Sequence, residues 1–147
     1  MKKYVWLPLI LMAVFGLAAT PTKAQSASGV RADVPFDFIV GDRTLPAGKI
    51  SVHAASTSNA GPLSITNYDK GQSTFRMSQL LRGPSTTEQG KLVFHKYGNQ
   101  YFLAEVWVPG YQALEVAKSK GERAIEREIK LSKNSKPELV SVFADMQ

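Results

Sequence analysis

Two histidines are the first candidates for chemistry in this sequence. His53 and His95 are the only ones, and the chain has no cysteine. A zinc or copper site needs several His, Cys or carboxylate ligands that converge on one point. Because the two histidines fall on different predicted strands, a site built from both would still be short of ligands. We therefore expect structural histidines and no metal centre.

Two carboxylates, Asp37 and Glu105, are the candidates for acid–base catalysis. Both lie in aromatic-rich predicted strands, and a pair of carboxylates is what a glycoside hydrolase uses. Alternation along a strand instead favours an outward position for each, paired with a lysine or arginine. The sequence also lacks the G-x-S-x-G elbow of serine hydrolases, and its glycines are isolated turn residues, not a phosphate-binding loop. We expect neither an enzyme nor a cofactor, with an unrecognised hydrolase as the catalytic alternative.

Four aromatic residues are the best candidates for a partner or ligand surface. They are Tyr97, Tyr101, Trp107 and Tyr111. Flat rings with polar edges suit stacking on sugars or contact with a partner protein. The same residue types are common in β cores because they favour strands. The sequence leaves both interpretations open.

The elements that must position these residues are mostly strands. Alternating apolar and polar residues predict six or seven short strands, beginning with one that spans residues 34–40. The others are expected near residues 50–54, 63–68, 73–81, 91–97 and 100–107, with shorter candidates at 113–117 and 140–144. This content predicts a mainly β, antiparallel sandwich or small barrel.

A hairpin around Gly98-Asn99 gives the best local signal. Glycine at the first central position suits a tight two-residue turn. That turn places Tyr97 opposite Gln100, His95 opposite Phe102, and Val93 opposite Ala104. Both faces of the hairpin are apolar in part, so we expect one face to be covered and the other partly covered.

One helix is expected near residues 120–132. Ser119 and Glu122 have the spacing of a capping box, in which each side chain satisfies a free amide at the helix start. Ile125 and Ile129 are one turn apart and would dock the helix on the sheet. The basic residues of this region alternate in sequence with acidic ones, which favours a solvated face over a polyanion site.

The first 24 residues have the order of a secretory signal peptide. Lys2 and Lys3 precede an apolar run from Val5 to Ala19, and Thr22-Lys23-Ala24 has the small-x-small pattern of a cleavage site. The run is shorter than the roughly 20 apolar residues that span a bilayer. We expect an exported protein, periplasmic or extracellular, with no transmembrane segment after cleavage and no cysteine for a lipid anchor.

Cleavage would also change the charge. The whole chain has 18 basic and 12 acidic residues, a formal charge of +6, and removal of three lysines would leave 15 against 12, or +3. This balance argues against nucleic acid as a partner. After cleavage we expect a flexible leader at 25–32 and one β domain at 33–147.

Three sequence blocks carry a resemblance. They are VPFDF with VG and LPAG at 34–48, LVFHKYG at 92–98, and YFL with VW and SK at 101–120. In this order they resemble a family of small exported bacterial proteins of unknown function. The resemblance implies a single β domain behind a signal peptide and supplies no catalytic residue.

Two functions follow as expectations. The first is an exported, non-catalytic β domain that binds an unknown partner protein or envelope polymer. The alternative is a lipocalin-like carrier, in which residues such as Phe36, Phe38 and Val106 line a barrel cavity for a small apolar ligand.

Overall fold

The computed structural model describes residues 29–55, 60–83, 86–131 and 136–147. The expected signal peptide and residues 25–28 of the expected leader lie outside these ranges. The elements, in chain order, are β1 (Gly29–Val34), β2 (Phe38–Val40), β3 (Arg43–Leu45), β4 (Gly48–Ala54), β5 (Gly61–Asn67), β6 (Gln72–Leu80), β7 (Gly90–Tyr97), β8 (Gln100–Trp107), β9 (Leu114–Val116), α2 (Lys120–Leu131) and β10 (Glu138–Met146).

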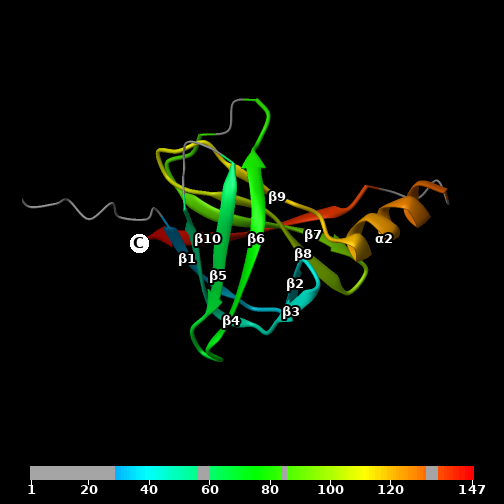
Figure 1. The fold of residues 1–147 in the computed structure, drawn as a ribbon, viewed down its shortest axis with the longest axis horizontal. Coiled ribbons are helices and arrows are strands. Elements are labelled where there is room, and N and C mark those ends of the chain that lie inside the picture. Colours follow the sequence, from blue (N-terminus) through cyan, green and yellow to red (C-terminus); the bar gives the residue numbers. More distant parts are fainter. Residues whose placement is uncertain (1–28, 56–59, 84–85, 132–135) are drawn as a thin grey trace, which may run out of the picture.

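Eight of the strands close into a barrel (Figure 1). Neighbouring strands follow the order β8, β7, β10, β1, β4, β5, β6 and β9, and β9 pairs back with β8 through Glu105 and Val106. All pairs in this ring are antiparallel. The β2–β3 hairpin lies beside the other half of β8, where Ile39 pairs with Phe102 in parallel. The mainly β, antiparallel prediction is confirmed, and the sheet forms a barrel.

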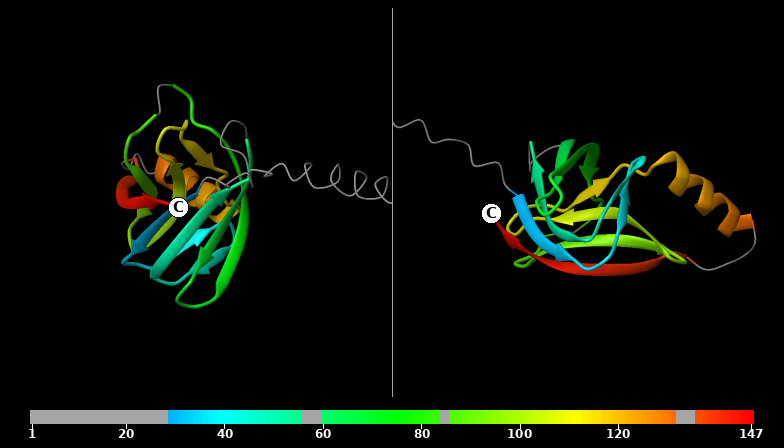
Figure 2. Two further views of the ribbon diagram at one scale, coloured as in Figure 1. Left: turned by 90° about the vertical axis from the view of Figure 1, so that its left-hand side faces the viewer. Right: turned by 90° about the horizontal axis from the view of Figure 1, so that it is seen from below.

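The C-terminal end of β10 and the helix α2 lie at opposite ends of this barrel (Figure 2). Figure 2 shows the end of β10 beside β1, with α2 at the far end of the long axis. No helix in the described ranges is long and apolar enough to cross a membrane.

The prediction of a single strand at residues 34–40 is wrong in detail. The segment is split into β1 and β2 because the chain turns after Val34, where Pro35 has no N–H to continue a ladder. Asp37 fixes this turn by accepting a hydrogen bond of 2.9 Å from the Ala47 amide. The first strand also begins earlier than the expected start of the β domain at residue 33, because β1 begins at Gly29 and buries Val30. With β3, these differences make six or seven strands too low a number.

The β7–β8 hairpin has the predicted register near its turn and a different one beyond it. Tyr97 pairs with Gln100 and His95 pairs with Phe102, as expected, and Gly98 at the turn has a positive φ of 60°. Past Phe94 the register shifts, and Val93 pairs with Glu105 instead of Ala104. One extra residue in β8 forms a bulge, which bends the strand where it leaves β2 and meets β9.

The inside of the barrel is filled with side chains. Phe94 is fully buried, and its ring centroid lies 5.2 Å from those of both Phe36 and Phe38 at steep interplanar angles. Edge-to-face contacts of this kind add stability beyond the area that is buried. Besides Phe94 and Phe38, the large residues that are fully buried are Val30, Val34, Leu45, Ile50, Val52, Leu63, Ile65, Leu92, Val106 and Leu114.

Candidate functional site

The four predicted aromatic residues do not share one surface. Tyr97 is buried under α2, whereas Tyr101 points to the opposite side of the hairpin and stacks on Phe36 with 4.0 Å between ring centroids. Trp107 is half-buried at the other end of β8, with the Lys91 ammonium 4.2 Å from its ring centroid. Tyr111, after β8, is 40% exposed. Core packing accounts for Tyr97 and Tyr101.

The two candidate carboxylates each have a separate local partner. Asp37 caps the turn described above, and Glu105 accepts a hydrogen bond of 2.7 Å from Trp107 Nε1. The expected pairing with lysine or arginine is therefore replaced by contacts with N–H groups. Of the histidines, His53 lies 2.9 Å from the Ser51 hydroxyl, while His95 belongs to a larger polar cluster.

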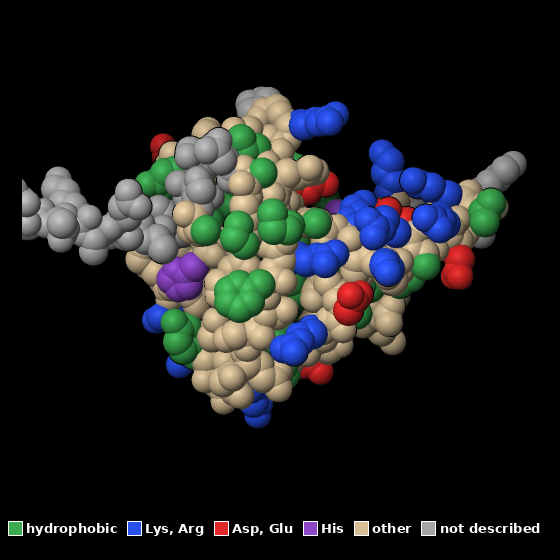
Figure 3. All heavy atoms as spheres, viewed as in Figure 1, with side chains coloured by type: hydrophobic (Ala, Val, Ile, Leu, Met, Phe, Trp, Pro, Cys, Tyr) green, Lys and Arg blue, Asp and Glu red, His purple; other side chains and the backbone are tan. Residues whose placement is uncertain are grey.

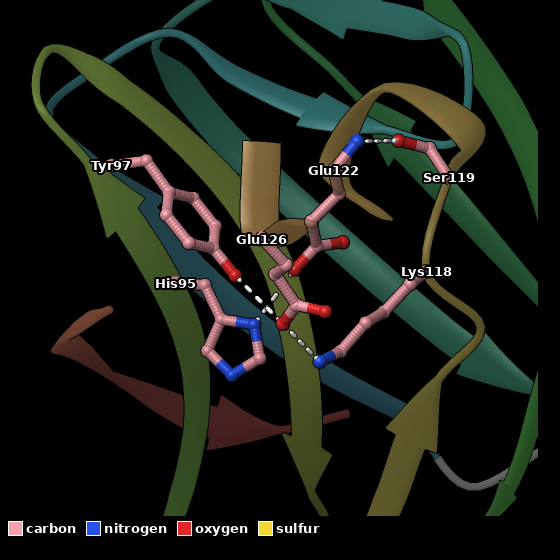
Figure 4. Close-up of polar contacts among 6 residues, drawn as sticks. All are labelled: His95, Tyr97, Lys118, Ser119, Glu122 and Glu126. Carbon is pink, nitrogen blue, oxygen red and sulfur yellow. Dashed lines mark hydrogen bonds and ion pairs between the residues drawn. The ribbon is translucent and has the colours of Figure 1, made fainter. Parts of the chain in front are cut away.

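This polar cluster lies between the β7–β8 hairpin and α2 (Figure 4). His95 Nδ1 is 2.8 Å from Oε1 of Glu122, a carboxylate that is only 2% exposed. The Tyr97 hydroxyl donates to Glu126 over 3.0 Å, and the Lys118 ammonium contacts the same carboxylate oxygen. Two strand residues are thus joined to two glutamates on one face of the helix.

The start of α2 is fixed by its cap and by an arginine from β6. The Ser119 hydroxyl accepts a hydrogen bond of 3.0 Å from the Glu122 amide, which confirms the predicted N-cap. The second half of the capping box differs, because the Glu122 side chain turns to His95. Arg76 donates to the carbonyls of Ala117 and Lys118 over 2.8 and 2.9 Å. The helix is therefore held at its first turn and along its inner face.

Burial and hydrogen bonding shift the pKa values of Tyr97 and Glu126 in the cluster. Burial, strengthened by the bond to Glu126, raises the pKa of Tyr97 well above its ordinary value of 10.0. Burial also acts to raise the pKa of Glu126. The hydrogen bonds from Lys118 and Tyr97, with the positive charge of Lys118, outweigh it and lower this pKa below 4.5. The neutral phenol and the ionised carboxylate therefore stabilise each other.

The cluster also contains possible metal ligands. One ligand atom from each of His95, Glu122 and Glu126 lies within 4.8 Å of the others. A nitrogen and two carboxylate oxygens are groups that a divalent metal can bind. Here the Lys118 ammonium already contacts Glu126, and His95 contacts Glu122. A cation would have to displace Lys118, so these contacts favour a structural role in holding α2 on the barrel.

Sequence reasoning missed this cluster, although a signal for it was present. Glu122 and Glu126 are four residues apart, and together with Ile125 and Ile129 they occupy the inner face of the helix. The two isoleucines are half-buried, as docking requires. Charged residues that share the docking face of a helix need partners on the surface they meet.

Turning both glutamates inward leaves cations on the outside of α2. Lys120, Arg123, Arg127 and Lys130 are all exposed, and Figure 3 shows basic side chains gathered over this helix. We call these four residues the basic stripe. It is next to a groove of about 380 Å³ that has Arg123 and Lys118 on one side and Met77 of β6 on the other.

Exposed apolar side chains continue from this groove along the outer face of β6. Phe75 is 72% exposed and Met77 57% exposed. Pro62 of β5 pairs with Met77 and is exposed as well. Large apolar side chains that lie together in the open are typical of interaction sites. The basic stripe, the groove and this apolar patch form the candidate functional surface.

No family model, curated protein or solved structure that was compared with the chain matches it. The resemblance of its sequence blocks to a family of exported proteins stays a prediction.

The lowered pKa of Glu126 predicts how the stability of the protein depends on pH. Because its pKa is lower in the folded state than in the unfolded chain, the unfolded state binds more protons as the pH falls through 4.5. The free energy of unfolding should therefore decrease between neutral pH and about pH 3, and Glu126→Gln should reduce that decrease. Urea denaturation of the wild type and of Glu126→Gln at several pH values measures this free energy. An equal pH dependence in the two proteins would show that Glu126 does not contribute to the pH dependence.

Proposed function

We propose that this protein is an exported, non-catalytic β-barrel domain that binds a partner protein or an envelope polymer through its outer surface. The observation that carries the proposal is the apolar patch of β6, where Phe75 and Met77 are exposed beside a groove. Burying two side chains of this size in a contact is worth roughly 1.5–3 kcal/mol each.

The inside of the barrel supports an outer binding surface over a carrier. Phe38 and Val106, expected to line a ligand cavity, are each 1% exposed, and Phe36 packs against the same core. Phe94 lies against both phenylalanines. A lipocalin-like ligand would have to displace these rings, and close-packed interiors resist such changes.

Replacing the two exposed side chains of the apolar patch should weaken binding without affecting the fold. In Phe75→Ser/Met77→Ser, two exposed side chains lose their apolar surface, so we expect an unchanged melting temperature and at least tenfold weaker binding. Co-sedimentation with purified bacterial cell-wall polymer measures one partner class. Surface plasmon resonance against immobilised envelope proteins measures the other.

The matched control is Leu139→Ser/Phe143→Ser on β10. These two residues are 62% and 65% exposed, close to the values of the tested pair, but lie on another strand. The control should bind as the wild type does. Equal binding by all three proteins, or a loss in the control alone, would move the binding surface away from β6.

A further inference from the structure

The helix α2 separates charges that alternate in the sequence. At about 100° per residue, the four members of the basic stripe fall within an arc of roughly 80° and extend over about 15 Å. Glu122 and Glu126 lie outside this arc, toward the barrel, and are held by His95, Tyr97 and Lys118. The two acids that alternate with these cations in the sequence are therefore engaged by partners on the barrel side of the helix. Glu128 lies at the flank of the stripe.

The basic stripe is directly connected to the apolar patch. Arg123 of the stripe and Met77 of the patch line the same groove, which crosses Val116 and Ala117 at the end of β9. One carboxylate, Glu115, lies in the groove and accepts a hydrogen bond of 2.9 Å from Gln79. Leu131, at the end of the helix, is 85% exposed and lies about 20° beyond the edge of the arc of the stripe.

Cations and apolar side chains face the same way. Figure 3, which shows the molecule along its shortest axis, has basic side chains over α2 and apolar side chains over β6 on one broad face. A flat partner can therefore touch both groups at once. A thin polyanion along the stripe would satisfy the cations and leave Phe75 and Met77 in water.

We infer that this face binds the surface of an anionic lipid bilayer. The basic stripe meets the negatively charged headgroups, while Phe75, Met77 and Leu131 enter the boundary between headgroups and acyl chains. Each cation close to an anionic bilayer contributes about fivefold to affinity, and buried apolar surface adds to it. The bilayer is a different partner from the protein or polymer proposed above, although it meets the same outer surface.

Vesicle flotation tests this binding with the whole protein. We expect binding to equimolar phosphatidylglycerol and phosphatidylcholine vesicles and little binding to phosphatidylcholine alone. Arg123→Glu/Arg127→Glu should weaken binding to the anionic vesicles by about 25-fold or more, since two cations are lost. Phe75→Ser/Met77→Ser should weaken it too, and the binding that this variant retains should disappear in high salt.

A control for net charge is Lys49→Glu/Lys70→Glu. Both lysines are exposed on β4 and on the β5–β6 turn, away from α2, and the change in charge is the same. This control should bind vesicles within about twofold of wild type. Circular dichroism and melting temperatures show whether each variant is folded.

Three results would overturn the inference. They are equal binding to both kinds of vesicle, equal losses in the stripe variant and the charge control, and binding to a soluble polyanion such as heparin without binding to vesicles. Because the vesicles contain neither protein nor polymer, failure here leaves the cell-wall and envelope-protein measurements unaffected. Failure of those measurements likewise leaves vesicle binding intact.

Discussion

Phe94→Ala is expected to lower the free energy of unfolding by about 3–5 kcal/mol. Phe94 is fully buried on β7 and contacts Phe36 and Phe38, which lie far from it in the sequence. Alanine would remove these ring contacts and leave a cavity that the surrounding strands, closed into a barrel, can fill only in part. Urea denaturation of both proteins, followed by tryptophan fluorescence, measures the difference.

Phe143→Ala is the matched control for this prediction. It makes the same chemical change on the neighbouring strand β10, but Phe143 is 65% exposed. Its cost should stay within about 0.5 kcal/mol, as for most surface substitutions. A cost below about 1 kcal/mol for Phe94→Ala, or similar costs for both variants, would contradict the packing of the two side chains described here.

Local signals in the sequence predicted the local parts of this fold. Gly98 and the alternation around it gave the first pairs of the β7–β8 hairpin, and Ser119 gave the start of α2. The bulge beyond Phe94 could not be predicted in this way, because it depends on β8 pairing with β2 in one half and with β9 in the other. Closure of the barrel is likewise a property of strands far apart in the chain.

Only part of the candidate functional surface could be predicted from the sequence. The helical positions of Glu122 and Glu126 place them on the face of the two isoleucines, so the mainly basic outer face of α2 follows from helical geometry. No comparable clue exists for β6. In β6, Phe75 and Met77 alternate with Thr74, Arg76 and Ser78. Arg76 pairs with the buried Leu63, so its side of the strand faces the barrel, and only this pairing shows that Phe75 and Met77 face outward.

The contact between His95 and Glu122 should be the largest single polar contribution to stability. Glu122 is only 2% exposed, and its Oε1 lies 2.8 Å from His95 Nδ1. His95→Ala would leave this carboxylate buried without that partner, which costs about 3–5 kcal/mol when a buried pair is broken. Hydrogen exchange should also show faster exchange of the α2 amides, because the cluster joins the helix to β7.

A double-mutant cycle separates this contact from the loss of packing. Glu122→Ala removes the carboxylate itself, so His95→Ala/Glu122→Ala should cost clearly less than the sum of the two single substitutions. Glu122→Gln, which keeps an oxygen acceptor for His95, should cost less than Glu122→Ala. Strictly additive costs would mean that the two side chains contribute independently. In that case α2 is held on the barrel by Tyr97, Lys118 and Glu126 and not by the buried pair.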